Sequence, residues 1–158
     1  MKSFVVLSSS AGQTRNIGMK LGKVTGAGDI ILLVGSLGAG KTCLTQGIAR
    51  GLGIHEYTVS PSFVLVREYQ GKLPLYHIDL YRLERLEEVS QLGLDDYFSG
   101  NGVCVVEWAD KGLGVLPQEH LLIEIEIISP IKRKLKFVPI GKRYLEILLK
   151  LKNEEAKK

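Results

Sequence analysis

The residues with the clearest capacity for chemistry lie between Gly35 and Thr42, where the chain reads GSLGAGKT. This octapeptide fits the pattern G-x-x-x-x-G-K-[ST], whose glycines let backbone N–H groups turn towards phosphate oxygens. A helix that follows such a loop presents its positive N-terminal end to the same oxygens. Lys41 is then expected to meet the β- and γ-phosphates, and the Thr42 hydroxyl to ligate Mg²⁺. The sequence therefore predicts a nucleoside triphosphate site.

Two carboxylates follow short apolar runs, as a metal site beside such a loop requires. Glu107 ends the run Val103–Val106, and an acidic residue at the end of a neighbouring buried strand is what holds the metal in P-loop enzymes. The alternative is that Glu107 ends a strand at the surface. Asp79 follows Leu75–Ile78 and has equal claims to two roles, one at the metal or the attacking water and one as partner of Arg82. The predicted catalytic residues are Lys41, Asp79 and Glu107, and the predicted metal ligands are Thr42 and Glu107.

The segments on either side of the glycine-rich loop predict the elements that position these residues. Asp29–Val34 is a continuous apolar run, typical of a strand buried on both faces in a parallel sheet. Lys41–Leu52 has apolar residues four apart and predicts a helix that ends near Gly51 and Gly53. The other predicted elements are strands at Ser3–Ser9, Phe63–Tyr69, Leu73–Leu80, Val103–Val106, Leu122–Ile127 and Lys134–Val138, a helix capped by Thr14, and helices at Glu84–Gln91 and Tyr144–Lys152.

These elements predict an α/β fold, a P-loop NTPase three-layer sandwich with a mixed sheet. The continuous apolar runs suit parallel strands in its centre, and the alternating runs near the C-terminus suit antiparallel strands towards an edge. Gln70–Lys72 lies between two strand-like runs and predicts a hairpin turn. At 158 residues the chain is expected to form one domain over residues 1–152, with a frayed basic tail at 153–158.

Composition narrows the class of protein. The net charge is +4, but residues 129–158 hold 10 of the 21 Lys and Arg and only 3 of the 17 Asp and Glu. The basic excess near the C-terminus suits either a solvated helix face or contact with RNA or an acidic protein. Cys43 and Cys104 are too few for a disulfide scaffold and favour a cytoplasmic location. No stretch approaches the ~20 apolar residues of a membrane span, so no membrane partner is expected.

Aromatic residues near these motifs have two interpretations. Trp108, the single tryptophan, either anchors the end of a strand or contacts the nucleotide or a partner protein. Tyr76, Tyr81 and Tyr97 are expected to pack in the core and at its rim rather than to stack on a base.

Four blocks beyond the glycine-rich loop make the chain resemble the TsaE family (formerly YjeE) of small bacterial P-loop ATPases, from about Thr14 to Pro117. The residues that carry the resemblance are GSLGAGKT (35–42), SPSFVLVREY (60–69), YHIDLYRL (76–83), LGLDDYF (92–98) and VEW (106–108).

The resemblance implies a part in making threonylcarbamoyladenosine, the modified base next to the anticodon of tRNAs that read codons beginning with A. It implies ATP or ADP and Mg²⁺ as ligands. It also implies a TsaD–TsaB heterodimer as partner. ATP hydrolysis would support repeated turnovers of that heterodimer, and tRNA would lie close to this chain within the complex.

Carried over by position, the resemblance adds Asp110 and the pair Lys132 and Arg133 to the nucleotide site. It also implies a switch-like loop over the nucleotide at Ser60, Pro61, Ser62 and Phe63. The predicted nucleotide-binding residues are thus Gly35, Ser36, Leu37, Gly38, Ala39, Gly40, Lys41, Thr42, Cys43, Asp79, Asp110, Lys132 and Arg133. The chain departs from the family at Ser36, usually an acid, at Cys43, usually Thr, and at Ser62, the third residue of a usual S-P-T.

Two other functions share this fold. A small-molecule kinase needs an Arg-rich lid to stabilise the transferring phosphoryl group, and residues 58–80 offer only Arg67. A nucleotide-sensing module without turnover stays compatible with the sequence. The chain has no guanine-reading N-K-x-D motif, which favours adenine as the base.

Overall fold

The computed structural model describes residues 3–56 and 65–157. The strands are β1 (Phe4–Ser8), β2 (Ile30–Val34), β3 (Val66–Tyr69), β4 (Leu75–Asp79), β5 (Val103–Glu107), β6 (His120–Ile127) and β7 (Arg133–Ile140). The helices are α1 (Ala11–Val24), α2 (Lys41–Gly51), α3 (Leu86–Ser90), α4 (Asp95–Phe98), η1 (Ala109–Lys111) and α5 (Lys142–Ala156). No helix of the described ranges is long and apolar enough to cross a membrane.

The described strands form one seven-stranded sheet in the order β1-β7-β6-β2-β5-β4-β3. The pairs β6–β2, β2–β5 and β5–β4 are parallel, and β1, β7 and β3 pair antiparallel with their neighbours. The predicted mixed sheet with a parallel centre is therefore confirmed, and antiparallel strands occupy both edges. The hairpin predicted at Gln70–Lys72 joins β3 to β4.

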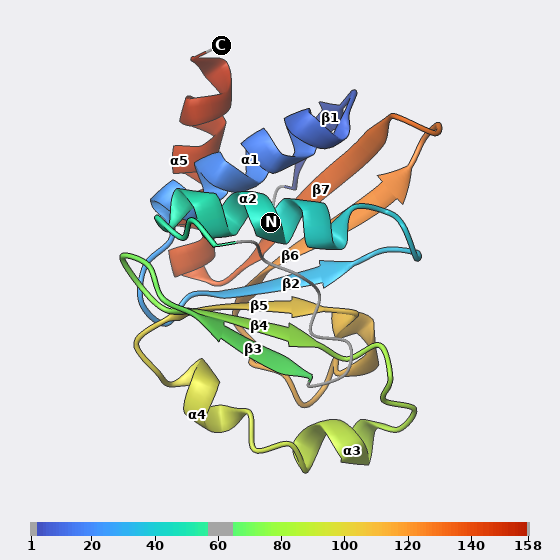
Figure 1. Ribbon diagram of the computed structural model, residues 1–158, viewed down its shortest axis with the longest axis vertical. Helices are drawn as coiled ribbons and strands as arrows, with labels where there is room; N and C mark the ends of the chain where they lie inside the picture. Colours follow the sequence, from blue (N-terminus) through green and yellow to red (C-terminus); the bar gives the residue numbers. More distant parts are fainter. Residues whose placement is uncertain (1–2, 57–64, 158) are drawn as a thin grey trace.

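Helices cover both faces of the sheet, as Figure 1 shows. Helices α1, α2 and α5 gather on one face, where α1 contacts both of the other two. The short α3 and α4 lie on the other side, and the ring of Tyr97 in α4 packs 5.1 Å from that of Tyr76 in β4. The central strands are fully enclosed, because every residue of β5 and the first four of β2 are buried.

Helices α1 and α2 touch backbone to backbone through glycines. An added Cβ at Gly47 would lie 2.0 Å from the carbonyl oxygen of Arg15, and one at Gly18 would lie 2.3 Å from that of Leu44. The next turn repeats the arrangement with Gly22 and Gly51. Because real Cβ atoms do not approach backbone this closely, these four glycines make the close helix contact possible. We call this contact the glycine seam.

Two helix ends differ most from their predicted positions. Helix α1 begins three residues before Thr14, because the Ser10 hydroxyl accepts a hydrogen bond from the Gln13 N–H at 3.1 Å and so caps the helix. Thr14 lies inside α1, buried, and shares a hydrogen bond with Ser8. The last helix runs to Ala156 rather than to Lys152, and Lys20 pairs with Glu155 near its end at 3.2 Å.

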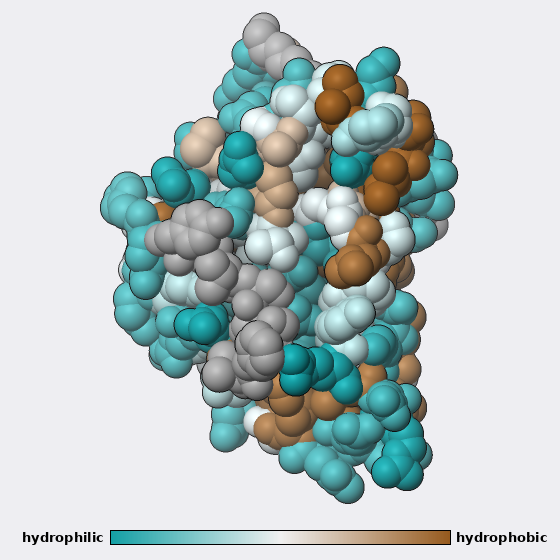
Figure 2. Space-filling view, turned by 45° about the vertical axis from the view of Figure 1, so that its right-hand side comes forward, coloured by the Kyte–Doolittle hydropathy of each residue, from teal (hydrophilic) through white to brown (hydrophobic). Residues whose placement is uncertain are grey.

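Exposed apolar side chains lie on β1 and in the turn between β6 and β7. Brown patches mark hydrophobic residues on the face in Figure 2. The large apolar residues exposed in this part of the chain are Val5, Leu7, Ile127, Ile128 and Ile131, and Leu37 is exposed in the glycine-rich loop.

Candidate functional site

The candidate site lies where the carboxyl ends of β2, β5 and β4 meet the start of α2. The loop of residues 35–40 joins β2 to α2, and two of its glycines have backbone angles that L side chains rarely adopt. Gly38 has a φ of 80° and Gly40, the residue before α2, a φ of 114°. Among the described residues, no atom beyond Gly38 and its two chain neighbours lies within 4 Å of a Cβ added at Gly38. These glycines turn the chain sharply into α2 and leave the loop open to a ligand.

Lys41 is the first residue of α2 and is only 4% exposed. Its ammonium donates to the carbonyl oxygens of Gly35 at 2.6 Å and Ser36 at 2.9 Å. Burial lowers the pKa of Lys41, and the negative charges of Glu107, Asp110 and Asp79 act in the opposite direction. The ammonium thus sits inside the loop, under the influence of three negative charges, with a positive charge to offer to a phosphate.

Thr42 and Glu107, the two predicted metal ligands, lie in contact. The Thr42 hydroxyl donates to the Glu107 carboxylate, with Oγ1 at 3.1 Å from Oε1 and 3.2 Å from Oε2. Glu107 is the last residue of β5 and is buried, so the interpretation as a surface strand end is wrong. Hydroxyl and carboxylate oxygens are the ligands that Mg²⁺ prefers, and this pair therefore fits the metal.

Asp79 lies beside Glu107 because it ends β4 in register with the end of β5. Its carboxylate is 3% exposed, and Oδ1 accepts the backbone N–H of Tyr81 at 2.9 Å. Asp79 lines the same cleft as Lys41, Thr42 and Glu107, which has a volume of about 390 Å³.

Aromatic rings close one side of this cleft. The Lys41 ammonium lies 4.0 Å from the centre of the Trp108 ring, within the range of a cation–π contact. The ring of Tyr81 packs 4.9 Å from that of Trp108, and Lys111 donates to the carbonyl oxygens of Tyr81 and Leu83. Trp108 is thus both an anchor of the strand end and a wall of the cleft, and Tyr81 packs at the rim as predicted.

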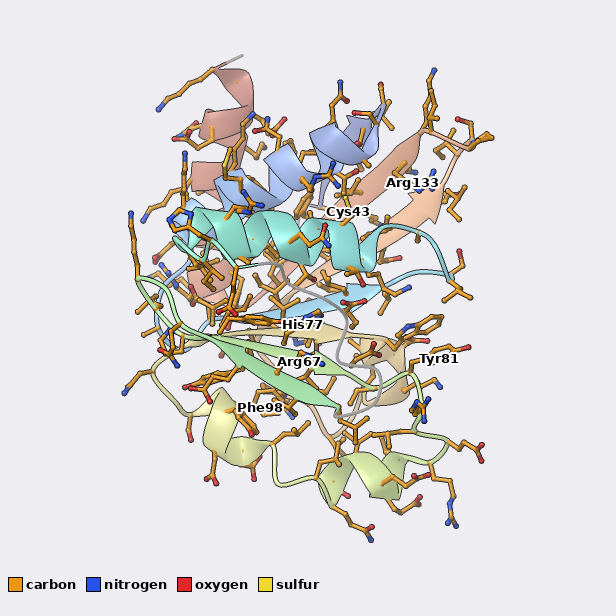
Figure 3. All side chains as sticks on the ribbon, in the orientation of Figure 1. Cys43, Arg67, His77, Tyr81, Phe98 and Arg133 are labelled. Carbon is orange, nitrogen blue, oxygen red and sulfur yellow. The ribbon has the colours of Figure 1, made fainter. Side chains whose placement is uncertain are left out.

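Arg133, the first residue of β7, reaches the loop from two strands away in the sheet. Its guanidinium donates from Nε to the Ala39 carbonyl oxygen at 2.9 Å and from Nη2 to that of Gly38 at 3.3 Å. In Figure 3 the loop lies at the right of the view, between Arg133 above it and Tyr81 below it. Lys132 is exposed next to Arg133, and Asp110 is exposed as well, although its charge acts on Lys41.

A second cleft of about 430 Å³ adjoins the first, because Gly38, Gly40 and Cys43 line both. Arg133 and the cap of α1 form its other walls. The Cys43 thiol donates to the carbonyl oxygen of Ala11 at 3.2 Å, and burial raises its pKa. The thiol is therefore neutral and fixed between α1 and the loop.

Two further regions relate differently to the sequence. The predicted switch-like loop Ser60–Phe63 lies outside the described residues. His77, which sequence reasoning missed, is fully buried against Glu107, with Nε2 at 2.5 Å from Oε2. Only its place two residues before Asp79 on one strand could have signalled this, since such residues share a face of the sheet.

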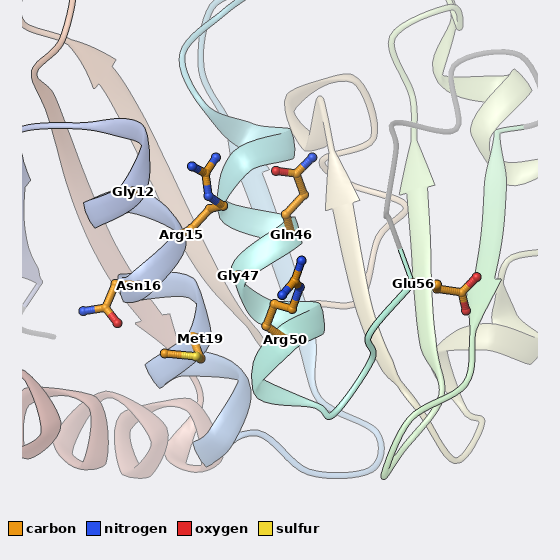
Figure 4. A pocket seen from close by; sticks show the side chains of 8 residues that line it. All are labelled: Gly12, Arg15, Asn16, Met19, Gln46, Gly47, Arg50 and Glu56. Carbon is orange, nitrogen blue, oxygen red and sulfur yellow. The ribbon is translucent and has the colours of Figure 1, made fainter.

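A cleft of about 500 Å³ also opens on the outer side of α1 and α2, away from the glycine-rich loop (Figure 4). It is lined by Gly12, Arg15, Asn16, Met19, Gln46, Gly47, Arg50 and Glu56. None of the predicted catalytic or metal-binding residues lines this cleft.

Comparisons with known proteins agree on one family. The model of the family described as "Threonylcarbamoyl adenosine biosynthesis protein TsaE" matches residues 8–135. The tRNA threonylcarbamoyladenosine biosynthesis protein TsaE of Bacillus subtilis is 50% identical over 118 residues, which cover 74% of this chain and 73% of that protein. Its counterpart in Treponema pallidum is 39% identical over 129 residues, covering 82% and 96%. The crystal structure of YdiB from Bacillus subtilis has a TM-score of 0.87 at 38% identity and covers 98% of this chain and 97% of that one.

Proposed function

This chain belongs to the TsaE family and takes part in tRNA threonylcarbamoyladenosine biosynthesis, and we propose that it acts there as a Mg²⁺-dependent ATPase that serves a TsaD–TsaB heterodimer. The observation that carries the proposal is the contact between the Thr42 hydroxyl and the Glu107 carboxylate, 3.1 Å apart beside a buried lysine. Oxygen ligands for a divalent ion and a cation for phosphate stand together at the mouth of one loop.

Each residue has a role that follows from its place. The backbone of residues 35–40 and the start of α2 bind the phosphates, and Lys41 supplies the charge that meets the β- and γ-phosphates. Thr42 and Glu107 would hold Mg²⁺, and the bound ion would supply positive charge for the oxygens of the transferring phosphoryl group. The buried carboxylate of Asp79 orients the attacking water or binds the metal through water.

The second cleft gives the nucleoside a place next to the phosphates. Because both clefts share Gly38, Gly40 and Cys43, a nucleotide with its phosphates on the loop extends into the space between Arg133 and α1. Arg133 supports the loop there through its bonds to Ala39 and Gly38. We assign the base as adenine, since the sequence lacks a guanine-reading motif.

The test is phosphate release from ATP and Mg²⁺, with and without a purified TsaD–TsaB pair. We expect slow release alone, faster release with the pair, and loss of both in Glu107→Gln, which keeps the shape of the side chain but removes its charge. ADP binding without metal should change little in that variant. Equal phosphate release by wild type and Glu107→Gln would refute the metal role of Glu107 and leave Asp79 as the ligand.

The same measurements separate the alternatives. A nucleotide-sensing module would bind ATP and Mg²⁺ but release no phosphate even with the pair. A small-molecule kinase would consume ATP only when an acceptor is added. Arg67, the one arginine that residues 58–80 contribute, lies exposed on the edge strand β3, which favours neither an acceptor lid nor a kinase.

Coupling to the partner is the remaining part of the proposal. A ligand shifts an equilibrium only between states that it binds unequally, so ATP and ADP must favour different states for the partner to sense the nucleotide. We assign this difference to the loop Ser60–Phe63 and expect TsaD–TsaB affinity to differ by about 5- to 150-fold between the two nucleotides. Equal affinities in ADP and in a non-hydrolysable ATP analogue would refute this switch.

A further inference from the structure

His77 occupies a fixed place behind the proposed metal ligand. Its side chain is 0% exposed, and its Nε2 lies 2.5 Å from Oε2 of Glu107. The β4–β5 register sets Asp79 against Glu107, and His77 lies two residues earlier on β4. Such diagonal neighbours on adjacent strands are close enough for long side chains to touch. The strand pairing therefore brings the imidazole to the carboxylate.

The direction of this hydrogen bond follows from the two groups. An ionised carboxylate only accepts hydrogen bonds, so the proton in the contact belongs to Nε2 of His77. The other ring nitrogen, Nδ1, is buried and has no hydrogen-bond partner among the described residues. An N–H at Nδ1 would leave a buried donor unsatisfied, which favours the ring form with its proton on Nε2. The ring is thus arranged to donate to Glu107 alone.

The Glu107 carboxylate has two kinds of partner. One oxygen accepts from His77, while both lie within reach of the Thr42 hydroxyl. A glutamate side chain has three rotatable bonds, and an unsupported one would spread over several rotamers. The hydrogen bond from a buried, immobile ring removes most of that freedom and directs the second oxygen towards Thr42.

We propose that His77 is a positioning residue that orients the Glu107 carboxylate for Mg²⁺. The proposal rests on the function proposed above, since it assumes that Glu107 holds the metal. Loss of a group that orients a metal ligand typically weakens metal binding by about 10- to 100-fold. His77 does not line the cleft at the glycine-rich loop, and so its loss should affect nucleotide binding only through the metal.

The experiment compares two amides at this position. In His77→Gln the side-chain amide nitrogen takes the place of Nε2 and keeps the donor, whereas in His77→Asn it takes the place of Nδ1 and the donor is lost. Calorimetry measures ADP affinity with Mg²⁺ and with EDTA. We expect Mg²⁺ to strengthen ADP binding in wild type and His77→Gln. In His77→Asn that strengthening should fall by about 10- to 100-fold while the affinity in EDTA stays unchanged.

A matched control is His120→Asn. His120 begins β6 at the opposite end of the sheet from the loop, and its Nδ1 contacts the carbonyl oxygen of Pro117 at 2.8 Å. This variant should keep the full effect of Mg²⁺. If His77→Asn also keeps it, the positioning role is refuted while the metal role of Glu107 stands. If wild type shows no effect of Mg²⁺, both proposals fall.

A measurement on the wild-type protein covers the case in which His77→Asn does not fold. Nitrogen-15 NMR of the imidazole rings shows which nitrogen of His77 carries the proton. We expect a proton on Nε2 and a shift of that signal when Mg²⁺ is added to the ADP complex. A proton on Nδ1 alone would overturn the proposal, because Nε2 would then donate nothing to Glu107.

Discussion

Helix α2 takes part in two contacts of opposite character. Its first turn brings Lys41 and Thr42 to Asp79 and Glu107, so charged groups with little exposure crowd together. Its middle lies along α1 at the glycine seam, where backbone meets backbone and no side chain intervenes. The first contact costs stability, because burial disfavours the charged form of Lys41 and lowers its pKa. The second contact is so tightly packed that no larger side chain fits between the two helices. The eleven residues of α2 therefore include one group that binds the ligand and another that stabilises the fold.

The largest effect should come from the glycine seam. In Gly47→Ala the new methyl group would lie 2.0 Å from the Arg15 carbonyl oxygen, and the two helices must move apart. Overpacking of this kind typically costs ~1–3 kcal/mol, and contact with rigid backbone places this variant at about 3 kcal/mol or beyond. Urea unfolding measures the loss.

The control is Gly12→Ala in α1, where the nearest atom to the new methyl group is the Ser10 hydroxyl oxygen at 3.7 Å. Its free energy of unfolding should stay equal or rise slightly. A similar loss in both variants would mean that the seam has no special role.

The next effect belongs to the site. Lys41→Ala removes the cation that meets the phosphates, and a charge-assisted contact of this kind is worth ~1.5–3 kcal/mol, or about 10- to 150-fold in ATP affinity. The free energy of unfolding without nucleotide should stay equal or rise slightly, because burial of the ammonium costs stability. Calorimetry and urea unfolding test the two halves. A loss of stability like that of Gly47→Ala would break the separation between the two regions.

A smaller effect concerns the core residue Cys104, whose burial makes the free energy of unfolding depend on pH. Burial raises the pKa of Cys104 from 9.0 to about 12. Below pH 9 the thiol is protonated in both states, and above it the unfolded chain loses the proton while the native state keeps it. The unfolded state then binds fewer protons, so stability falls as the pH rises from 9 towards 12. From pH 8 to pH 10 the loss should be about 1.4 kcal/mol.

Urea unfolding of wild type and Cys104→Ala at pH 8 and pH 10 isolates this contribution. The variant should be less stable at pH 8 but show a flatter dependence on pH, since Cys43 and the other titrating groups are common to both proteins. Equal slopes would show that Cys104 ionises as easily in the native state as in the unfolded chain.

The smallest effect concerns the support of the loop. Arg133→Ala removes the bonds to Ala39 and Gly38, and net hydrogen-bond contributions of ~0.5–1.5 kcal/mol correspond to about 2- to 12-fold in ATP affinity. The exposed neighbour Lys132 is the matched control, with a smaller loss expected in Lys132→Ala. Equal losses would mean that both residues act through charge alone.

Much of the site was predictable because local sequence positions it. The glycine-rich loop needs only a strand before it and a helix after it, and both patterns are short and regular. Thr42 and Glu107 meet because parallel strands end at the same edge of a sheet, which requires the fold class but no register. The alternation of polar and apolar residues likewise predicted β6 and β7.

What escaped prediction depends on register and on small differences in energy. The contact of His77 with Glu107 requires knowing that Asp79 pairs with Glu107. Arg133 was predicted only through the family resemblance, because its bond to the loop spans 94 positions of the chain. Ser10 and Thr14 are both able to cap a helix, and only the folded chain selects Ser10. The four-residue helix α4 carries too little periodicity to be recognised from the sequence.

Trp108 gives the site its own optical reporter. It is the single tryptophan of the chain, and its indole lies 4.0 Å from the Lys41 ammonium and 4.9 Å from the ring of Tyr81. A charge that moves beside an indole changes the energy of its excited state, so the colour and yield of emission follow the position of that ammonium. Fluorescence excited at a wavelength that only tryptophan absorbs therefore reports on the loop without an added label and without emission from the tyrosines.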